Sequence, residues 1–277
     1  MILLLCGCMN KKDESSKNVN IYTTVYPITY ITSKLYGENN VVKSIYPNGV
    51  DLNDYKLTDK QIKEYSSVNM FVYIGLGNEK EIAKSFLNKN KKLEIIDASY
   101  GLSYNNKLEE LWIAPNNFLM LAKNIKASLN EYIDNEFILN SIEKNYDEIY
   151  KDISWMDAEL RSIAKESKDN NSNTIITKSN VFDYLTNYGF KVISLDNINN
   201  NEKSDIKSKF KNGTYSSILK LDTEKNSDFM NELDDNYSAK IININSMITN
   251  NDSSSDYKTL DESLFVIIEL ILIILAL

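Results

Sequence analysis

The residue types that most often carry catalysis and metal binding are nearly absent from this sequence. It contains no histidine, and its two cysteines, Cys6 and Cys8, stand together near the start of the chain. Ser-His and Cys-His catalysis are therefore excluded, as are zinc sites rich in histidine or cysteine. The chemistry that remains is that of oxygen atoms from carboxylates, amides, hydroxyls and 18 tyrosines. A hydrolase with two carboxylates across a cleft would need a recognisable pair, and we find no motif for one.

Composition and charge describe a folded acidic protein. Of its 277 residues, 43% are hydrophobic and 25% are charged, which is typical of a chain that buries a core. Lys and Arg number 31 against 39 for Asp and Glu, a net charge of −8. No overall positive field is present to attract phosphates, so nucleic acid is not an expected partner. The length favours two lobes or one large domain.

The first residues bear on location. The stretch Leu5-Cys6-Gly7-Cys8 resembles a bacterial lipobox, in which the last cysteine is lipidated, so Cys8 is the expected anchor to the membrane. The polar residues from Met9 to Val19 then form a flexible tether. Because the apolar run before Cys6 is shorter than the about 7–15 residues of a signal segment, a short apolar strand with two buried thiols is the alternative.

The apolar stretch from Leu264 to Leu277 is interrupted only by Glu269. It is shorter than the roughly 18–20 residues that cross a bilayer, so we expect a buried terminal helix. A tail resting on a membrane or an altered reading frame are the alternatives.

Short β-rich runs alternate with helical stretches over most of the chain. The runs that predict strands are Ile21–Val25, Val41–Tyr46, Val68–Ile74, Leu93–Ile96, Ile175–Thr177, Val192–Leu195, Ile218–Leu221 and Lys240–Ile244. Alternation of strands and helices predicts parallel sheets covered by helices. The expected fold class is α/β, with two lobes that each contain a parallel sheet.

An apolar stripe between the two groups of strands predicts one long helix. Its members recur every three or four residues and are Leu139, Ile142, Tyr146, Ile149, Ile153, Met156, Leu160 and Ile163. From Leu139 to Ile163 such a helix extends about 37 Å, long enough to run along both lobes. We therefore expect a signal remnant, lipobox and tether over residues 1–19, an N-terminal lobe over 20–134, a rigid linking helix over 135–170 and a C-terminal lobe over 171–277.

Several motifs follow the predicted strands, where open parallel sheets bind ligands. They are Thr24-Val25-Tyr26-Pro27, Tyr46 to Tyr55, Tyr73 to Glu79, Trp112-Ile113-Ala114-Pro115 and Ser179 to Tyr184. In order and spacing they resemble the substrate-binding lipoproteins of bacterial ABC transporters for zinc and manganese, also called cluster-9 binding proteins. The resemblance covers nearly the whole chain. It implies two α/β lobes that are joined by a rigid long helix and hold one metal ion between them.

The resemblance also implies which positions would hold the metal. The segment Gly49 to Tyr55 is similar to the family's Gly-x-Asp-x-His-x-Tyr motif and has Asn53 at the first histidine. Glu110 stands at the second, two residues before Trp112, and Ser179 at the third. Asn245 stands where the family has its closing aspartate. The implied metal positions are therefore Asn53, Glu110, Ser179 and Asn245.

These four side chains offer only oxygen atoms and one carboxylate. Such donors suit Ca²⁺, Mg²⁺ or Mn²⁺ better than Zn²⁺, and a single charge is a poor match for a desolvated divalent ion. Zinc or manganese is implied by the resemblance, while a neutral ligand or none remains open. Asn53 and Asn245 could instead cap loops, Ser179 could cap a helix, and Glu110 could be solvated.

The expected function is that of a solute receptor and not an enzyme. It would be a lipid-anchored monomer on the extracytoplasmic face of the bacterial cell membrane, delivering its solute to a membrane permease driven by an ATPase. The absence of histidine motivates the alternative, a degenerate surface protein or adhesin that has lost metal binding and transport.

Overall fold

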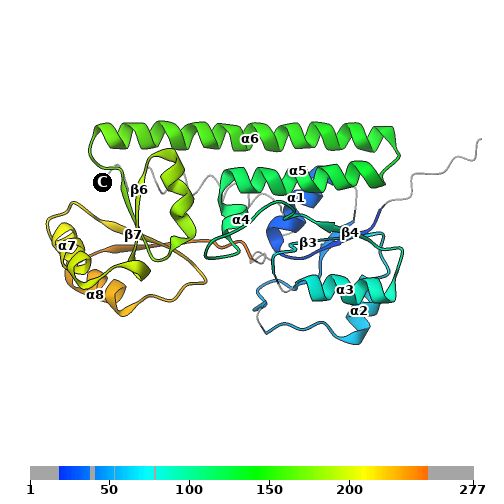
Figure 1. The fold of residues 1–277 in the computed structure, drawn as a ribbon, viewed down its shortest axis with the longest axis horizontal. Coiled ribbons are helices and arrows are strands. Elements are labelled where there is room, and N and C mark those ends of the chain that lie inside the picture. The colour runs from blue at the N-terminus through cyan, green and yellow to red at the C-terminus, as the bar shows by residue number, and fades with distance from the viewer. Residues whose placement is uncertain (1–18, 38–40, 53, 78, 249–277) are drawn as a thin grey trace, which may run out of the picture.

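The structure, a computed structural model, describes residues 19–37, 41–52, 54–77 and 79–248. Cys8, Asn53 and the apolar stretch Leu264 to Leu277 lie outside the described residues. Two lobes lie side by side, and the long helix α6 (Glu136–Asp169) runs across both of them (Figure 1).

The N-terminal lobe is built on a four-stranded parallel sheet in the order β2-β1-β3-β4. Its strands are β1 (Ile21–Thr23), β2 (Val42–Ser44), β3 (Met70–Tyr73) and β4 (Glu94–Asp97), and its connecting helices are α1 (Tyr26–Tyr36), α2 (Asp59–Tyr65) and α3 (Glu79–Lys89). Ile21 of β1 is paired with Val42 on one side and Met70 on the other. Strand β2 lies on one side of β1, and β3 lies on the other side. The order of the strands therefore reverses between β1 and β3, which is the topological switch point of the sheet.

The C-terminal lobe repeats this topology with the strand order β6-β5-β7-β8. Its strands are β5 (Thr174–Thr177), β6 (Lys191–Ser194), β7 (Ser217–Leu221) and β8 (Lys240–Ile244), with α7 (Asn200–Lys211), α8 (Asp228–Tyr237) and the short η2 (Leu195–Asn197) between them. The segment after β5, which contains most of the motif Ser179 to Tyr184, is a 3₁₀ helix, η1 (Asn180–Tyr188). The switch point of this sheet lies between β5 and β7. All eight predicted strands and the α/β fold are confirmed.

Helix α6 extends the predicted stripe by about one turn at its N-terminal end and by nearly two turns at its C-terminal end. Its 34 residues span about 51 Å. The helix begins where the side chain of Asn135 accepts hydrogen bonds from the N–H groups of Phe137 and Ile138, which satisfies two of the free donors of the first turn. The predicted long linking helix is therefore present, while the domain boundaries placed at its ends stay a prediction.

One long helix, α5 (Pro115–Tyr132), was not singled out by the sequence. It packs along α6, and α1 packs against both helices. Its buried side chains are Pro115, Phe118, Leu121, Ala122, Ile125 and Leu129. This layer covers the N-terminal sheet on the side of α6.

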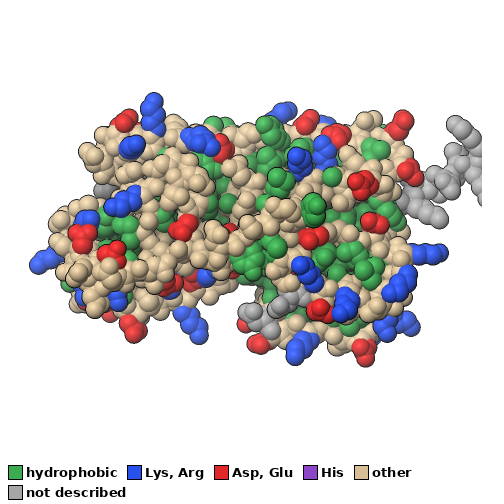
Figure 2. Space-filling model, in the orientation of Figure 1, with side chains coloured by type: hydrophobic (Ala, Val, Ile, Leu, Met, Phe, Trp, Pro, Cys, Tyr) green, Lys and Arg blue, Asp and Glu red, His purple; other side chains and the backbone are tan. Residues whose placement is uncertain are grey.

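A single cluster of buried apolar side chains reaches from one lobe into the other. It includes Ile21 of the first sheet, Leu121 of α5, Ile149 of α6 and Leu219 of the second sheet. Each lobe also has one smaller cluster, which lies under α2 and α3 in the N-terminal lobe and under α7 and α8 in the C-terminal lobe. Charges of both signs are scattered over the face in Figure 2, whose outline is indented between the lobes on the side away from α6.

Candidate functional site

Loops at the carboxyl ends of strands from both sheets meet between the lobes. The N–H of Tyr26, just after β1, donates to the carbonyl of Ile248 at 3.1 Å. The indole N–H of Trp112, in α4 (Glu110–Ile113), donates to the carbonyl of Ser246 at 2.8 Å. Both bonds join the N-terminal lobe to the segment that follows β8, and α4 also packs against η1. The lobes are therefore in direct contact in the region where a ligand was expected.

Glu110 uses its carboxylate to hold the loop that leads into α4. One oxygen accepts the N–H of Asn105 at 2.9 Å, and the other accepts those of Asn106 at 2.9 Å and Lys107 at 3.0 Å. Glu110 also lies near Asp183 in η1 of the other lobe. Burial raises the pKa of Asp183, and the negative charge of Glu110 raises it further. The carboxylate is thus already satisfied by three backbone donors.

Ser179 follows β5 and is buried. It occupies the N-cap position of η1 with extended backbone, yet its side chain forms no capping hydrogen bond. Among the described residues its buried hydroxyl has no hydrogen-bond partner, but it lies close enough to the carboxylate of Glu224 to help lower the pKa of that group. Ser179 therefore faces a polar group between β5 and β7, at the switch point of the second sheet.

Asn245 is exposed and closes a turn. Its side-chain oxygen accepts the N–H of Met247 at 2.8 Å, and Met247 has a φ of 59°. An asparagine that bonds to the backbone two residues further on is a common turn device. The interpretation of Asn245 as a loop cap describes its present bonding.

Within the described parts of the chain, the side chains of Glu110, Ser179 and Asn245 share no hydrogen bond with one another. Glu110 begins α4 and bonds to the loop before it, Asn245 bonds to Met247, and the hydroxyl of Ser179 has no hydrogen-bond partner among the described residues. Asn53, the fourth position, lies outside the described residues. The set of four ligand positions stays a prediction.

An ion pair that the sequence did not single out joins the two lobes. Nζ of Lys107, from the loop before α4, lies 2.7 Å from a carboxylate oxygen of Glu224, in the loop after β7. The Glu224 side chain is only 4% exposed, and its other oxygen accepts the N–H of Leu221 at 2.8 Å. Burial alone would raise the pKa of Glu224, but the hydrogen bonds it receives, first of all from Lys107, outweigh burial and lower that pKa.

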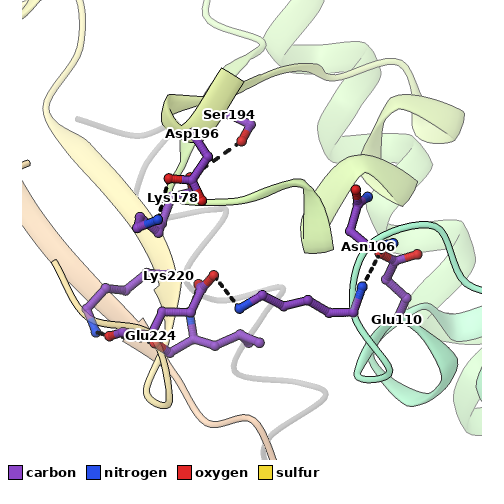
Figure 3. A network of polar contacts seen from close by, with 9 residues as sticks. Asn106, Glu110, Lys178, Ser194, Asp196, Lys220 and Glu224 are labelled. Atoms are coloured by element: carbon purple, nitrogen blue, oxygen red, sulfur yellow. Dashed lines mark hydrogen bonds and ion pairs between the residues drawn. The ribbon is translucent and has the colours of Figure 1, made fainter. Parts of the chain in front are cut away.

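Two further lysines anchor the loops around this pair. The buried ammonium of Lys220 donates to the carbonyls of Leu221, at 3.2 Å, and Glu224, at 2.6 Å. Lys178, at the end of β5, forms an ion pair with Asp196. Figure 3 shows Lys220 and Glu224 on the C-terminal lobe and Glu110 on the other lobe, where its carboxylate lies beside Asn106 of its own loop. The ammonium groups of three lysines therefore lie in this region, and two of them pair with carboxylates.

The positions of Lys107 and Glu224 in the sequence are themselves compatible with a site. Lys107 stands three residues before the predicted Glu110, and Glu224 follows the strand that ends at Leu221. Charged residues in a loop after a parallel strand are candidates for a site. Their pairing across the lobes could not be deduced, because 117 positions separate them along the chain.

The described side chains do not fit a divalent metal ion as they stand. No group of three or more histidine, cysteine, aspartate or glutamate side chains that could hold one exists within residues 19–248 as far as they are described. The carboxylate of Glu110 is held by backbone N–H groups and that of Glu224 by Lys107. A metal would have to displace the ammonium or draw on Asn53.

Comparison of the sequence with curated proteins gives consistent relatives. The iron-binding protein YfeA of Yersinia pestis is 25% identical over 203 residues, which cover 69% of this chain and 63% of YfeA. The manganese ABC transporter substrate-binding lipoprotein PsaA of Streptococcus mitis is 28% identical over 227 residues, covering 73% of this chain and 70% of PsaA. A metal ABC transporter substrate-binding lipoprotein of Lactococcus lactis is matched over 64% of its length. The chain thus spans slightly less than two thirds of two of these relatives.

Solved structures show the same fold. The metal-dependent lipoprotein YcdH of Bacillus subtilis has a TM-score of 0.69 at 19% identity, covering 91% of this chain and 98% of that one. The laminin-binding protein Lmb of Streptococcus agalactiae has the same TM-score at 18% identity, with 91% and 99% covered. Within the described residues, no helix has both the length and the apolar character that a membrane span requires.

The family profile described as "Zinc-uptake complex component A periplasmic" matches residues 21–262. This match includes all eight strands and helix α6. It is a family of binding proteins, in agreement with the expectation that the chain is not an enzyme. The chain belongs to the zinc-uptake complex component A family of metal ABC transporter substrate-binding proteins.

Proposed function

We propose that this chain is the extracytoplasmic solute-binding lipoprotein of an ABC transporter, with a solute site that contains no histidine. The observation that carries the proposal is the meeting of strand-end loops from two lobes in a member of a metal-uptake family. Open parallel sheets place ligands at such loops.

The proposed partners are a membrane permease and its ATPase. This proposal is supported by the names of the Streptococcus mitis and Lactococcus lactis relatives, which are substrate-binding lipoproteins of ABC transporters. Lipidation of Cys8 would hold the protein, as a monomer, on the outer face of the cell membrane. Replacing Cys8 with alanine should release the protein into the medium.

The proposed solute contacts are oxygen atoms of Asn53, Glu110, Ser179 and Asn245. If the solute is a metal ion, manganese fits these donors better than zinc, because zinc in proteins prefers imidazole and thiolate ligands. The relatives are named for iron, manganese and zinc, so the family does not fix one ion. The donors of this chain argue for a solute other than zinc.

Thermal unfolding of the metal-stripped protein tests the receptor function. Mn²⁺, Zn²⁺, Ca²⁺, oxoanions and amino acids would each be added separately, and one class is expected to raise the melting temperature. A ligand at 100 times its Kd stabilises the folded state by about 2.7 kcal/mol. The responding solute should also lose its effect, wholly or in part, in the variant Ser179→Ala. A protein whose melting temperature no solute changes would contradict the proposal.

A second candidate function is that of a surface adhesin without transport. The Lmb structure is described as a bifunctional protein with adhesin and metal transporting activity. The pairing of Glu224 with Lys107, which leaves that carboxylate no need of a bound cation, favours this candidate over a metal carrier. The first test is binding to immobilised laminin, with serum albumin as the control surface. The second is solute uptake in cells that lack the protein. Specific laminin binding together with unaltered uptake would support the adhesin over the receptor.

A further inference from the structure

Glu224 is a carboxylate that lies between the lobes and is almost completely removed from water. A buried, ionised carboxylate without a positive partner is strongly destabilising, so such a group either takes up a proton or pairs with a cation. In this chain the cation is the ammonium of Lys107, which comes from the opposite lobe. The positive charge that pairs with Glu224 across the lobes is thus supplied by a side chain of the polypeptide.

We propose that Lys107 is a tethered cation, which neutralises Glu224, keeps the lobes together without a bound metal ion and excludes divalent cations from this carboxylate. The proposal goes beyond the receptor function and holds whichever solute is carried. It assigns to Lys107 the role of a residue that determines cation specificity.

Both ends of the pair are fixed independently of each other. On the N-terminal lobe, the backbone N–H of Lys107 is held by Glu110 at 3.0 Å, so the lysine side chain starts from a fixed point. On the C-terminal lobe, Glu224 is held through its carboxylate by Leu221 and through its carbonyl by Lys220. Groups that are already positioned lose less entropy when they pair, which favours a lasting contact.

The surrounding charges make the lysine the favoured occupant. Burial raises the pKa of Glu109, Lys107 opposes this shift, and the charges of Glu224 and Asp222 add to it. Glu109 therefore lies near Lys107 and near two carboxylates of the other lobe. An ammonium group at the position of Lys107 balances negative charge that could otherwise attract a divalent cation.

The pair differs from an ordinary surface salt bridge in its burial. Lys207 and Glu232 also form an ion pair, but within the C-terminal lobe and with side chains 33% and 39% exposed. Exposed pairs contribute about 0–1 kcal/mol. Lys107 has nearly the same exposure as Lys207, at 32%, whereas Glu224 is 4% exposed. Lys207 is therefore a matched control for the loss of one lysine charge.

The test compares Lys107→Met with Lys207→Met and with the unaltered protein. Methionine keeps most of the apolar stem and removes the charge. In the metal-stripped state, hydrogen exchange in segments 104–110 and 221–224 is expected to be at least about tenfold faster in Lys107→Met, because the bond between the lobes is lost. Binding of Mn²⁺, followed by calorimetry, is expected to be at least about tenfold tighter than in the unaltered protein. Lys207→Met should change neither property.

Equal exchange rates and equal Mn²⁺ affinity in both lysine variants would overturn the proposal. If Lys107→Met does not fold, the double variant Lys107→Met/Glu224→Gln keeps the question open to measurement, because it removes both charges. The double variant is expected to fold and to show no Mn²⁺ binding at this place. A double variant that is unfolded like Lys107→Met, or that binds Mn²⁺ more tightly than the unaltered protein, would show that Lys107 does not act through Glu224.

Discussion

Glu79 is a second buried carboxyl group, and its surroundings favour the neutral form. It lies after β3, is 5% exposed and accepts the N–H of Ile74 at 2.8 Å. Burial raises its pKa from 4.5 to about 7, with the bond from Ile74 opposing the shift and the charge of Asp97 adding to it. Among the described residues no lysine pairs with Glu79 as Lys107 pairs with Glu224, and the two buried carboxyl groups have opposite pKa shifts.

The raised pKa of Glu79 predicts a stability that falls as the pH rises. Between pH 4.5 and about 7 the folded protein keeps a proton that the unfolded chain has lost, so the free energy of unfolding decreases over this interval and is flat above it for this group. The variant Glu79→Gln should lack this loss and be more stable than the unaltered protein at pH 8, by up to about 3 kcal/mol. Urea unfolding at pH 5 and pH 8 measures the difference.

The control for this prediction is Glu81→Gln, two residues further along α3, because the side chain of Glu81 is exposed. It should have no effect on the pH dependence. Identical pH dependence in Glu79→Gln and the unaltered protein would show that Glu79 is ionised throughout.

At the scale of the elements, α6 owes its stability to one buried stripe. The side chains that face the lobes are Ile142, Ile149, Ile153, Met156, Leu160 and Ile163. The rest of the helix is largely polar, and a single helix in water gains little from its own hydrogen bonds. Packing against α5 and α1 therefore holds α6 in place.

Truncation in this stripe should cost much more than truncation on the outer face. Ile142→Ala removes a fully buried side chain and is expected to lower the free energy of unfolding by about 2–5 kcal/mol. Phe137→Ala, in the first turn and 83% exposed, should change it by about 0.5 kcal/mol or less. Chemical denaturation of the two variants side by side gives both values, and a similar cost for both would contradict the assigned orientation of α6.

At the scale of the whole molecule, the two lobes share one apolar core. Buried side chains of both sheets and of α6 form a continuous cluster, and polar contacts such as that of Trp112 with Ser246 close the interface. Lobes that share a core do not separate widely, so we expect small sliding movements rather than hinge opening when a solute binds.

A shared core also predicts one cooperative unfolding transition. Trp112 lies where the lobes meet, and Trp155 is on the exposed face of α6. In the variant Trp155→Phe the fluorescence reports on Trp112 alone, since the chain has two tryptophans. Its urea transition should coincide with the loss of helical circular dichroism. Two separate transitions would mean that the lobes unfold independently.

Much of this architecture could be predicted from the sequence because it depends on local patterns. Runs of β-branched residues predicted the eight strands, and the stripe from Leu139 to Ile163 predicted α6, since periodicity reflects which face is buried. Helix α5 has a comparable but shorter pattern, with Phe118, Leu121, Ala122, Ile125 and Leu129 buried on one face. The 3₁₀ form of η1 has no such pattern in the sequence.

The site was less predictable than the fold. The aligned motifs led to Glu110, which begins α4, and to Ser179 and Asn245, which follow strands β5 and β8. Their bonding partners, three backbone N–H groups for Glu110 and the N–H of Met247 for Asn245, follow from loop geometry that no periodic pattern encodes. Whether they contact a solute stays a prediction.

The sequence by itself determined the absence of imidazole, the two parallel sheets and the helix that joins them, because composition and periodicity are properties of the chain alone. Only the tertiary structure decided that Lys107 meets Glu224. These residues are far apart in the chain, and their contact exists because two separately folded sheets bring the ends of their strands to a common interface. The charge balance at that interface is therefore a property of the folded molecule.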